Sequence, residues 1–225
     1  MNDRVGIILQ ARMGSTRLPG KVLMPFRHTT LLGWILERLR DLPWPVVVAT
    51  SNLPRDDDIE QYCRGMDASC FRGSEGDVLD RYFRCAQNHG FDHVIRLTGD
   101  NPFPDIEMLR ILVETHLENG ADYTHSFGQL PVGTGAEIFS FVALERSWKE
   151  GTAEHHREHV NEYVLDFPSN FHTASIEIPA ARRAPDLQLT IDSGEDYLRV
   201  LSYLNGLADV HVTTEELIRR CSSSV

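Results

Sequence analysis

The sequence predicts an α/β protein in which helices cover both faces of a mostly parallel sheet. Apolar runs of strand length alternate with segments of helical periodicity along most of the chain. The 225 residues can bury one large core, and the fractions of 41% hydrophobic and 24% charged residues are typical of globular proteins. We therefore expect a single domain over residues 1–225.

The predicted elements follow one another in regular order. Strand-length apolar runs occupy 5–9, 45–50, 68–71, 93–97, 122–126, 137–141, 173–178 and 187–191. Apolar residues three or four positions apart predict helices at 31–39, 78–86 and 106–117. Strands that alternate with helices in this way favour parallel pairing.

The stretch 128–135 interrupts this alternation, because it contains Pro131 and glycines. We expect a small substrate and dimerisation lobe to begin there. It would run through a helix at 154–165 and return to the sheet near Leu187. The predicted lobe is thus an insertion of roughly 128–185 in the single domain.

Composition excludes several classes of function. The chain has 33 acidic and 22 basic residues, and this net charge of −11 argues against general nucleic-acid binding. The longest apolar runs are too short to span a membrane. The four cysteines form no C-x-x-C pair and no apolar signal segment precedes them, so we expect reduced thiols in a cytoplasmic protein.

The first predicted strand leads into a loop that carries three cations, Arg12, Arg17 and Lys21. Gly14 lets the backbone approach an anion closely, and Pro19-Gly20 favours a tight turn. Arginine can grip phosphate oxygens with two N–H groups, and lysine adds a compact charge. The loop therefore predicts a phosphate site. The alternative is a set of solvated loop charges, and in either case we expect Lys21 to be exposed and dispensable for folding.

Two common phosphate motifs do not fit this loop. A P-loop has four residues between its glycines and then Lys-Ser or Lys-Thr, whereas five residues separate Gly14 from Gly20 and Val22 follows Lys21. The dinucleotide fingerprint G-x-G-x-x-G is also absent. These differences disfavour a P-loop NTPase and a dinucleotide-dependent dehydrogenase.

Two aspartates, Asp100 and Asp192, follow the predicted strands 93–97 and 187–191. Carboxylates at the ends of parallel strands meet at one sheet edge, where they can hold Mg²⁺ together with phosphate oxygens. An aspartate in such a place is otherwise a turn or cap residue. Ser193 and Asp196 have the spacing of a capping box, so we assign them a structural role.

The segment 155–159 reads H-H-R-E-H and satisfies the zinc-protease pattern H-x-x-E-H. Helical spacing would place His155 and His159 on one face of a helix. A zinc hydrolase is therefore an alternative, although five-residue matches arise by chance and a phosphate loop has no place in such an enzyme.

The loop sequence QARMGSTRLPGKVL resembles the opening motif of the cytidylyltransferases that activate acidic sugars, which include CMP-sialate and CMP-Kdo synthetases. It is most similar to the branch named for spore coat polysaccharide biosynthesis protein F. Further blocks at 72–82, 96–103, 157–160 and 191–196 extend the resemblance over nearly the whole chain. One departure is Ser193-Gly194, where the family commonly has Thr-Pro.

The resemblance implies a Rossmann-like nucleotidyltransferase sheet and transfer of CMP from CTP to an acidic sugar, with release of pyrophosphate. It also implies Mg²⁺, with Mn²⁺ as a substitute, and a homodimer. The implied catalytic residues are Arg12, Lys21, Asp100 and Asp192, of which Asp100 and Asp192 are the metal ligands. The implied nucleotide-binding residues are Ala11, Arg12, Gly14, Ser15, Arg17, Lys21, Ser74 and Asp77. The implied substrate-binding residues are Glu137, Arg157 and His159.

Several alternatives stay open at this stage. The enzyme could use another nucleotide or a phosphorylated acceptor, or the chain could be a catalytically silent nucleotide-binding module. Asp77 could instead favour the start of the following helix, and Arg157 and His159 could lie on a helix surface. Either carboxylate or a metal-bound water could accept the proton of the acceptor hydroxyl.

Overall fold

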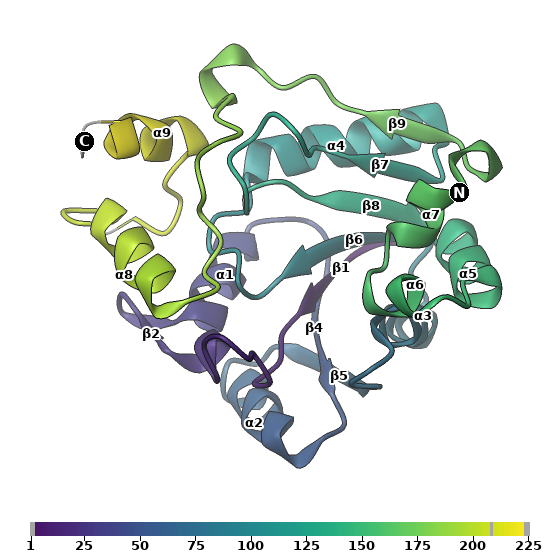
Figure 1. Ribbon diagram of the computed structural model, residues 1–225, viewed down its shortest axis with the longest axis horizontal. Helices are drawn as coiled ribbons and strands as arrows, with labels where there is room; N and C mark the ends of the chain where they lie inside the picture. Colours follow the sequence, from purple (N-terminus) through teal and green to yellow (C-terminus); the bar gives the residue numbers. More distant parts are fainter. Residues whose placement is uncertain (1–2, 208, 223–225) are drawn as a thin grey trace.

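A seven-stranded sheet forms the centre of the protein, with strand order β5-β4-β1-β6-β8-β7-β9 (Figure 1). The computed structural model describes residues 3–207 and 209–222. The strands are β1 Val5–Gln10, β4 Val46–Ser51, β5 Ser69–Gly73, β6 His93–Thr98, β7 Tyr123–His125, β8 Glu137–Ser140 and β9 Thr173–Ser175. A separate hairpin consists of β2 Pro25–Phe26 and β3 Thr29–Thr30.

Helices surround this sheet. They are α1 Leu31–Leu39, α2 Asp57–Gly65, α3 Val78–His89, α4 Ile106–Asn119, α5 Phe141–Glu150, α6 Glu154–Glu158, α7 Glu162–Asp166, α8 Gly194–Tyr203 and α9 Thr214–Ser222. Short 3-10 turns are η1 Lys21–Leu23, η2 Pro54–Asp56, η3 Pro168–Asn170 and η4 Ala180–Arg182. The three helices predicted from periodicity are confirmed as α1, α3 and α4.

The sheet is mostly parallel, as predicted. Strand β1 pairs in parallel with β4 and with β6. Strand β4 also pairs in parallel with β5, and β7 pairs in parallel with β9. Strand β8 runs antiparallel to both of its neighbours. Because strands in such sheets are covered on both faces, β1 is a continuous apolar run that is buried over most of its length.

Alternate residues of β1 contribute to two separate cores. Ile7 and Leu9 pack in the core that includes residues of α1, α4 and α8, whereas Ile8 packs in the core beneath α3 and α5. This follows from the two-residue period of a strand, which sends successive side chains to opposite faces. The predicted coverage of both faces is therefore confirmed.

The predicted strand at 187–191 is wrong. Only Gln188 forms a bridge, with Val132, and the N–H of Ile191 donates to the carbonyl of Asp100 at 2.9 Å. Strand β6 is already paired on both sides, by β1 and β8, so no sheet edge is open beside it. The segment instead forms backbone hydrogen bonds with Val132, in the loop after β7, and with Asp100, in the loop after β6.

The predicted substrate lobe covers roughly 128–185. Strands β8 and β9 lie in this range and belong to the central sheet. The predicted helix at 154–165 is two short helices, α6 and α7, because His159 is extended at φ −122° and ψ 118° between them. Strands β8 and β9 are also shorter than predicted, since Ser140 caps α5 and pairing ends at Ser175.

Two further observations concern membrane-spanning helices and the state of the cysteines. Within 3–207 and 209–222, no helix is both long and apolar enough to cross a membrane. Cys63, Cys70, Cys85 and Cys221 are free thiols.

The predicted capping box at the start of α8 is confirmed. Ser193 Oγ accepts from the N–H of Asp196, and Asp196 Oδ2 accepts from the N–H of Ser193 at 2.9 Å. The same oxygen of Asp196 accepts from the N–H of Asp192 at 3.2 Å. The cap thus fixes the backbone that carries Asp192.

Ser193→Ala should lower the free energy of unfolding by about 1 kcal/mol, because the first turn of α8 loses its cap. Urea denaturation measures this change. Ser202→Ala is the matched control, since Ser202 bonds only a helix carbonyl near the exposed end of α8 and should change stability by less than about 0.5 kcal/mol. Equal effects of the two substitutions would contradict the capping role.

Candidate active site

A cavity of about 280 Å³ opens at the carboxyl ends of β1 and β6. This is the edge at which open α/β sheets bind ligands. The lining residues include eight that the sequence predicts, Ala11, Arg12, Gly14, Ser15, Arg17, Lys21, Asp100 and Asp192. Gln10, Arg96 and Thr98 line it as well. The other predicted site residues, Ser74, Asp77, Glu137, Arg157 and His159, are not among the lining residues.

Asp56 holds the loop that follows β1, a role that sequence analysis missed. Its Oδ1 accepts from the N–H of Met13 at 2.8 Å, and its Oδ2 accepts from the backbone and hydroxyl of Ser51. The side chain is fully buried. Asp56 is the first residue of the run D-D-D at an acidic helix start, so in the sequence it resembles an ordinary N-terminal charge.

The loop is closed by its own backbone. Met13 O accepts from the N–H of Ser15 and of Gly20, and Gly20 has a positive φ of 72° that suits glycine. In the described part of the chain, the N–H groups of Gly14, Thr16 and Arg17 donate to no protein atom. Such free N–H groups in a tight loop favour an anion.

Lys21 lies between the two predicted metal ligands. Its Nζ donates to Asp100 Oδ2 at 2.9 Å, to Asp192 Oδ1 at 3.0 Å and to the carbonyl of Ile191 at 2.8 Å. The expectation of an exposed lysine is wrong, because the side chain is only 9% exposed. The turn at Gly20 and the following η1 direct it inward, where the carboxylates compensate its charge.

Asp100 is held in its ionised form. Burial acts to raise the pKa of Asp100, but the charge of Lys21 and hydrogen bonds from Thr98 and Lys21 outweigh it, so the pKa is lowered. Thr98 Oγ1 donates to Asp100 Oδ1 at 2.6 Å and accepts from Asn101. The carboxylate is therefore anchored on both oxygens.

The other two loop cations are more exposed. Arg17 pairs with Asp192 Oδ2 at 2.9 Å, and its side chain is 68% exposed. Arg12 lies 3.8 Å from Glu75, with 42% of its side chain exposed. Because exposed ion pairs are weak, these two side chains can exchange their partners for a bound anion at little cost.

Arg157 does not face the cavity but binds Asp77. Its guanidinium donates twice to Asp77 Oδ2 and also to the carbonyls of Trp148 and Gly151. Asp77 Oδ1 caps α3, and the N–H of Asp77 donates to Ser74 Oγ. The structural alternative for Asp77, at the start of a helix, is thus what the geometry shows.

Glu137 is fully buried at the start of β8. Its carboxylate accepts from Arg96 and from the hydroxyl of Tyr123. Burial acts to lower the pKa of Arg96, but the charge of Glu137 outweighs it and raises the pKa. Arg96 is therefore a permanent cation in the wall of the cavity.

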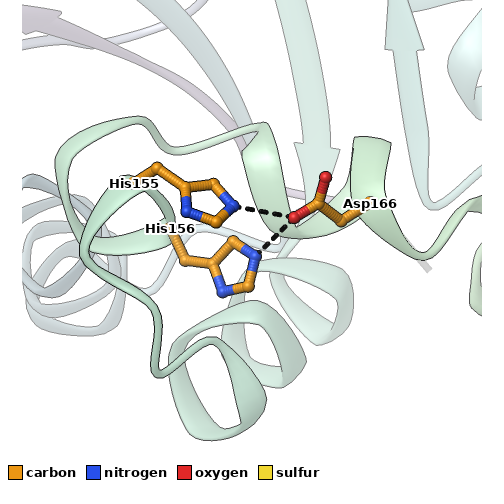
Figure 2. A group of neighbouring side chains, drawn as sticks. All are labelled: His155, His156 and Asp166. Atoms are coloured by element: carbon orange, nitrogen blue, oxygen red, sulfur yellow. Dashed lines mark hydrogen bonds and ion pairs between the residues drawn. The ribbon is translucent and has the colours of Figure 1, made fainter.

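The histidines of the H-x-x-E-H segment do not form the predicted pair. Helix α6 ends at Glu158, so His155 and His159 do not share a helix face. Figure 2 shows instead that His155 and His156 both direct Nε2 to Asp166 Oδ2, each at 2.8 Å. These bonds join α6 to α7, and none of the three residues lines the cavity.

Comparisons with known proteins agree with this geometry. A cytidylyltransferase family model matches residues 6–218. The chain is 38% identical over 204 residues to the spore coat polysaccharide biosynthesis protein SpsF of Bacillus subtilis, across 88% of this chain and 84% of that protein. The structure of a cytidylyltransferase from Leptospira borgpetersenii has a TM-score of 0.93 and 34% identity, and the match covers 99% of this chain and 95% of that one.

A more distant structure shares the fold. It is a CMP:2-keto-3-deoxy-manno-octonic acid synthetase complexed with CTP, with a TM-score of 0.72 and 16% identity. The match covers 91% of this chain and 99% of that one. The fold is thus the Rossmann-like nucleotidyltransferase sheet that the motifs indicate.

Lys21→Met should lower the free energy of unfolding by about 1–3 kcal/mol near neutral pH, because two partly buried carboxylates lose their counter-ion. Since the pKa of Asp100 is lowered in the native protein, its stabilising contribution is present above about pH 4 and is lost as the pH falls through the lowered value. Without Lys21 we expect burial to raise that pKa, so the loss in stability should shrink towards about pH 4.

Urea denaturation at several pH values measures both effects. Arg12→Met is the matched control, because this exposed cation has only a distant partner and should change stability little. A loss for Lys21→Met that equals the control and does not vary with pH would contradict the buried-cation arrangement.

Proposed function

Because the chain belongs to the cytidylyltransferase family and is a nucleotidyltransferase, we propose that it transfers CMP from CTP to the hydroxyl group of an acidic sugar and releases pyrophosphate. The product would be an activated precursor for a surface polysaccharide. The observation that carries this proposal is the convergence of a phosphate loop and two carboxylates, Asp100 and Asp192, around Lys21 in one cavity.

The oxygen atoms around Lys21 suit a hard divalent cation. Asp100, Asp192 and the carbonyl of Ile191 place three oxygens about the Nζ of Lys21, at 2.8–3.0 Å. Carboxylate and carbonyl oxygens are the protein ligands that Mg²⁺ prefers, and this place already accommodates a positive charge. We therefore propose Asp100 and Asp192 as ligands of Mg²⁺ or Mn²⁺. When bound, the metal would neutralise charge on the phosphate oxygens.

The loop would hold the triphosphate. Arg12 and Arg17 have exposed guanidinium groups, and the free N–H groups of Gly14 and Thr16 lie between them in the sequence. In our proposal Lys21 leaves the carboxylates and donates to phosphate oxygens instead. These donors would stabilise the charge that develops as the bond to pyrophosphate breaks.

The transfer itself requires no protein nucleophile. The acceptor hydroxyl oxygen would form a bond to the α-phosphorus as the bond from that phosphorus to pyrophosphate breaks, and pyrophosphate leaves with the electron pair. The hydroxyl proton must go to a base. Its lowered pKa makes Asp100 a weak base, so Asp100 is better suited to binding a cation than to accepting this proton.

Other parts of the proposal come from the family alone. They are contacts of Ser74 and Asp77 with the nucleotide, contacts of Glu137, Arg157 and His159 with the acceptor, and a homodimer. The cytoplasmic location that we propose rests instead on the cysteine pattern. The ion pair of Asp77 with Arg157 supports an indirect contribution of both, through the start of α3. The rivals are a transferase for another nucleotide or a phosphorylated acceptor, and a silent nucleotide-binding module.

The choice of nucleotide is directly testable. With Mg²⁺ present, CTP should raise the melting temperature of the protein more than UTP, ATP or GTP at the same concentration, because we expect CTP to have the lowest Kd. A ligand at about 100 times its Kd stabilises the native state by about 2.7 kcal/mol. Arg12→Met should reduce the shift caused by CTP, and Arg64→Met, an exposed change on α2, should not. Equal stabilisation by all four nucleotides would contradict selection of cytidine.

The metal ligands are tested by charge removal. Asp100→Asn and Asp192→Asn should each slow CTP-dependent pyrophosphate release by orders of magnitude while thermal melting shows a folded protein, since amide oxygens bind Mg²⁺ more weakly. EDTA should abolish activity, and Mg²⁺ or Mn²⁺ should restore it. Asp166→Asn and His155→Ala are controls outside the cavity and should retain activity. Near-normal turnover in both cavity variants would refute the two-carboxylate site, and zinc-dependent activity lost in His155→Ala would favour the hydrolase.

A further inference from the structure

The cavity contains four cations among the described residues that line it, and one of them is separate from the phosphate loop. Arg12, Arg17 and Lys21 lie on that loop, whereas Arg96 comes from the middle of β6. A nucleotidyl transfer to an acidic sugar brings two anions together, the triphosphate and the sugar carboxylate. With the loop cations directed to phosphate, Arg96 is the cation left for the second anion.

The guanidinium of Arg96 has N–H groups to spare. Nη1 donates to Glu137, whereas Nε is buried and has no hydrogen-bond partner. Nη2 donates to no protein atom in the described ranges. Arginine has five N–H donors, and unsatisfied donors are costly in a partly buried site. This side chain is therefore suited to donate hydrogen bonds to an oxygen atom of a ligand.

Gln10 provides a second unsatisfied group beside Arg96. The register of β1 and β6 places Gln10 opposite Thr98 and Ile8 opposite Arg96, so Gln10 and Arg96 share one face of the sheet. The Oε1 atom of Gln10 is buried and has no partner. The two ends of an amide are assigned from hydrogen bonding, so Gln10 can equally present its NH₂ group to an anion.

We propose that Arg96 binds the carboxylate of the acceptor sugar, together with Gln10, and that Glu137 and Tyr123 are positioning residues for Arg96. This inference rests on the proposed function. Glu137 is fully buried and accepts from both Arg96 and Tyr123, and Arg96 lies 5.9 Å from the centre of the Tyr82 ring. These contacts fix the plane of the guanidinium before the ligand arrives, which favours two-point binding of a carboxylate.

The groups that face this part of the cavity favour an anion over a neutral hydroxyl group. Arg96 presents only donors, and the Tyr123 hydroxyl donates to Glu137. Arg157, the other arginine assigned to the acceptor, is held by Asp77 and two carbonyls. Glu137 lies behind Arg96 and not in the cavity lining.

The test uses the full chain, CTP, Mg²⁺ and two probe acids, N-acetylneuraminate and 2-keto-3-deoxy-manno-octonate, each compared with its methyl ester. The wild-type protein should prefer acid to ester. Arg96→Gln should lower kcat/KM for the acid about 100-fold, mainly through KM for the acid, while KM for CTP changes less than about twofold. The preference for acid over ester should disappear, and a purely structural arginine would not affect that preference.

A second variant guards against misfolding, because Arg96→Gln leaves Glu137 buried without a cation. The double variant Arg96→Gln with Glu137→Gln removes both charges and should fold, bind CTP and lack the preference for acid. Arg64→Gln, an exposed change on α2, is the matched control and should behave as wild type. Tyr123→Phe should raise KM for the acid by a smaller factor.

The outcomes separate this inference from the proposed function. A double variant that binds CTP and keeps the wild-type KM and preference for acid overturns the role of Arg96 and leaves the proposed function intact. A wild-type protein that releases pyrophosphate with a neutral or phosphorylated sugar, but with neither acid, overturns the acidic acceptor and the role of Arg96 with it.

Discussion

The active site depends on one buried cation shared by two carboxylates. Lys21, Asp100 and Asp192 come from three distant parts of the sequence, and Lys21 Nζ draws them together within hydrogen-bond distance. The positive charge of Lys21 is compensated by both carboxylates, and Lys21 in turn compensates part of their negative charge. The loop after β1, the turn after β6 and the segment before α8 are therefore fixed relative to one another.

Much of this arrangement could be predicted from the sequence, because it follows from local rules. The apolar run at Val5 and the cations behind it indicate a strand that ends in an anion-binding loop, and Asp100 lies at the end of a second such strand. The capping box at Ser193 is equally local, since two residues, Ser193 and Asp196, and their spacing define it. The two strands, the position of Asp100 after the second of them and the capping box agree with the structure.

The parts that could not be predicted depend on long-range packing. Apolar periodicity at 187–191 indicates an extended segment, but it does not show whether a sheet edge is free to pair with it. In the structure, β8 already pairs with the edge of β6 that this segment would need. Asp56 resembles two neighbouring aspartates in the sequence, yet only its carboxylate is fully buried beneath the loop. The inward course of Lys21 likewise depends on both distant carboxylates. The fold class was thus easier to predict than the burial of individual charges.

The position of Asp192 along the chain has a consequence for biosynthesis. All seven strands of the central sheet precede it, so they are synthesised before this residue. Until then Lys21 has only Asp100 as a carboxylate partner, and the cavity lacks one wall. In the growing polypeptide, the strands of the sheet are therefore synthesised before the metal site that we propose can be complete.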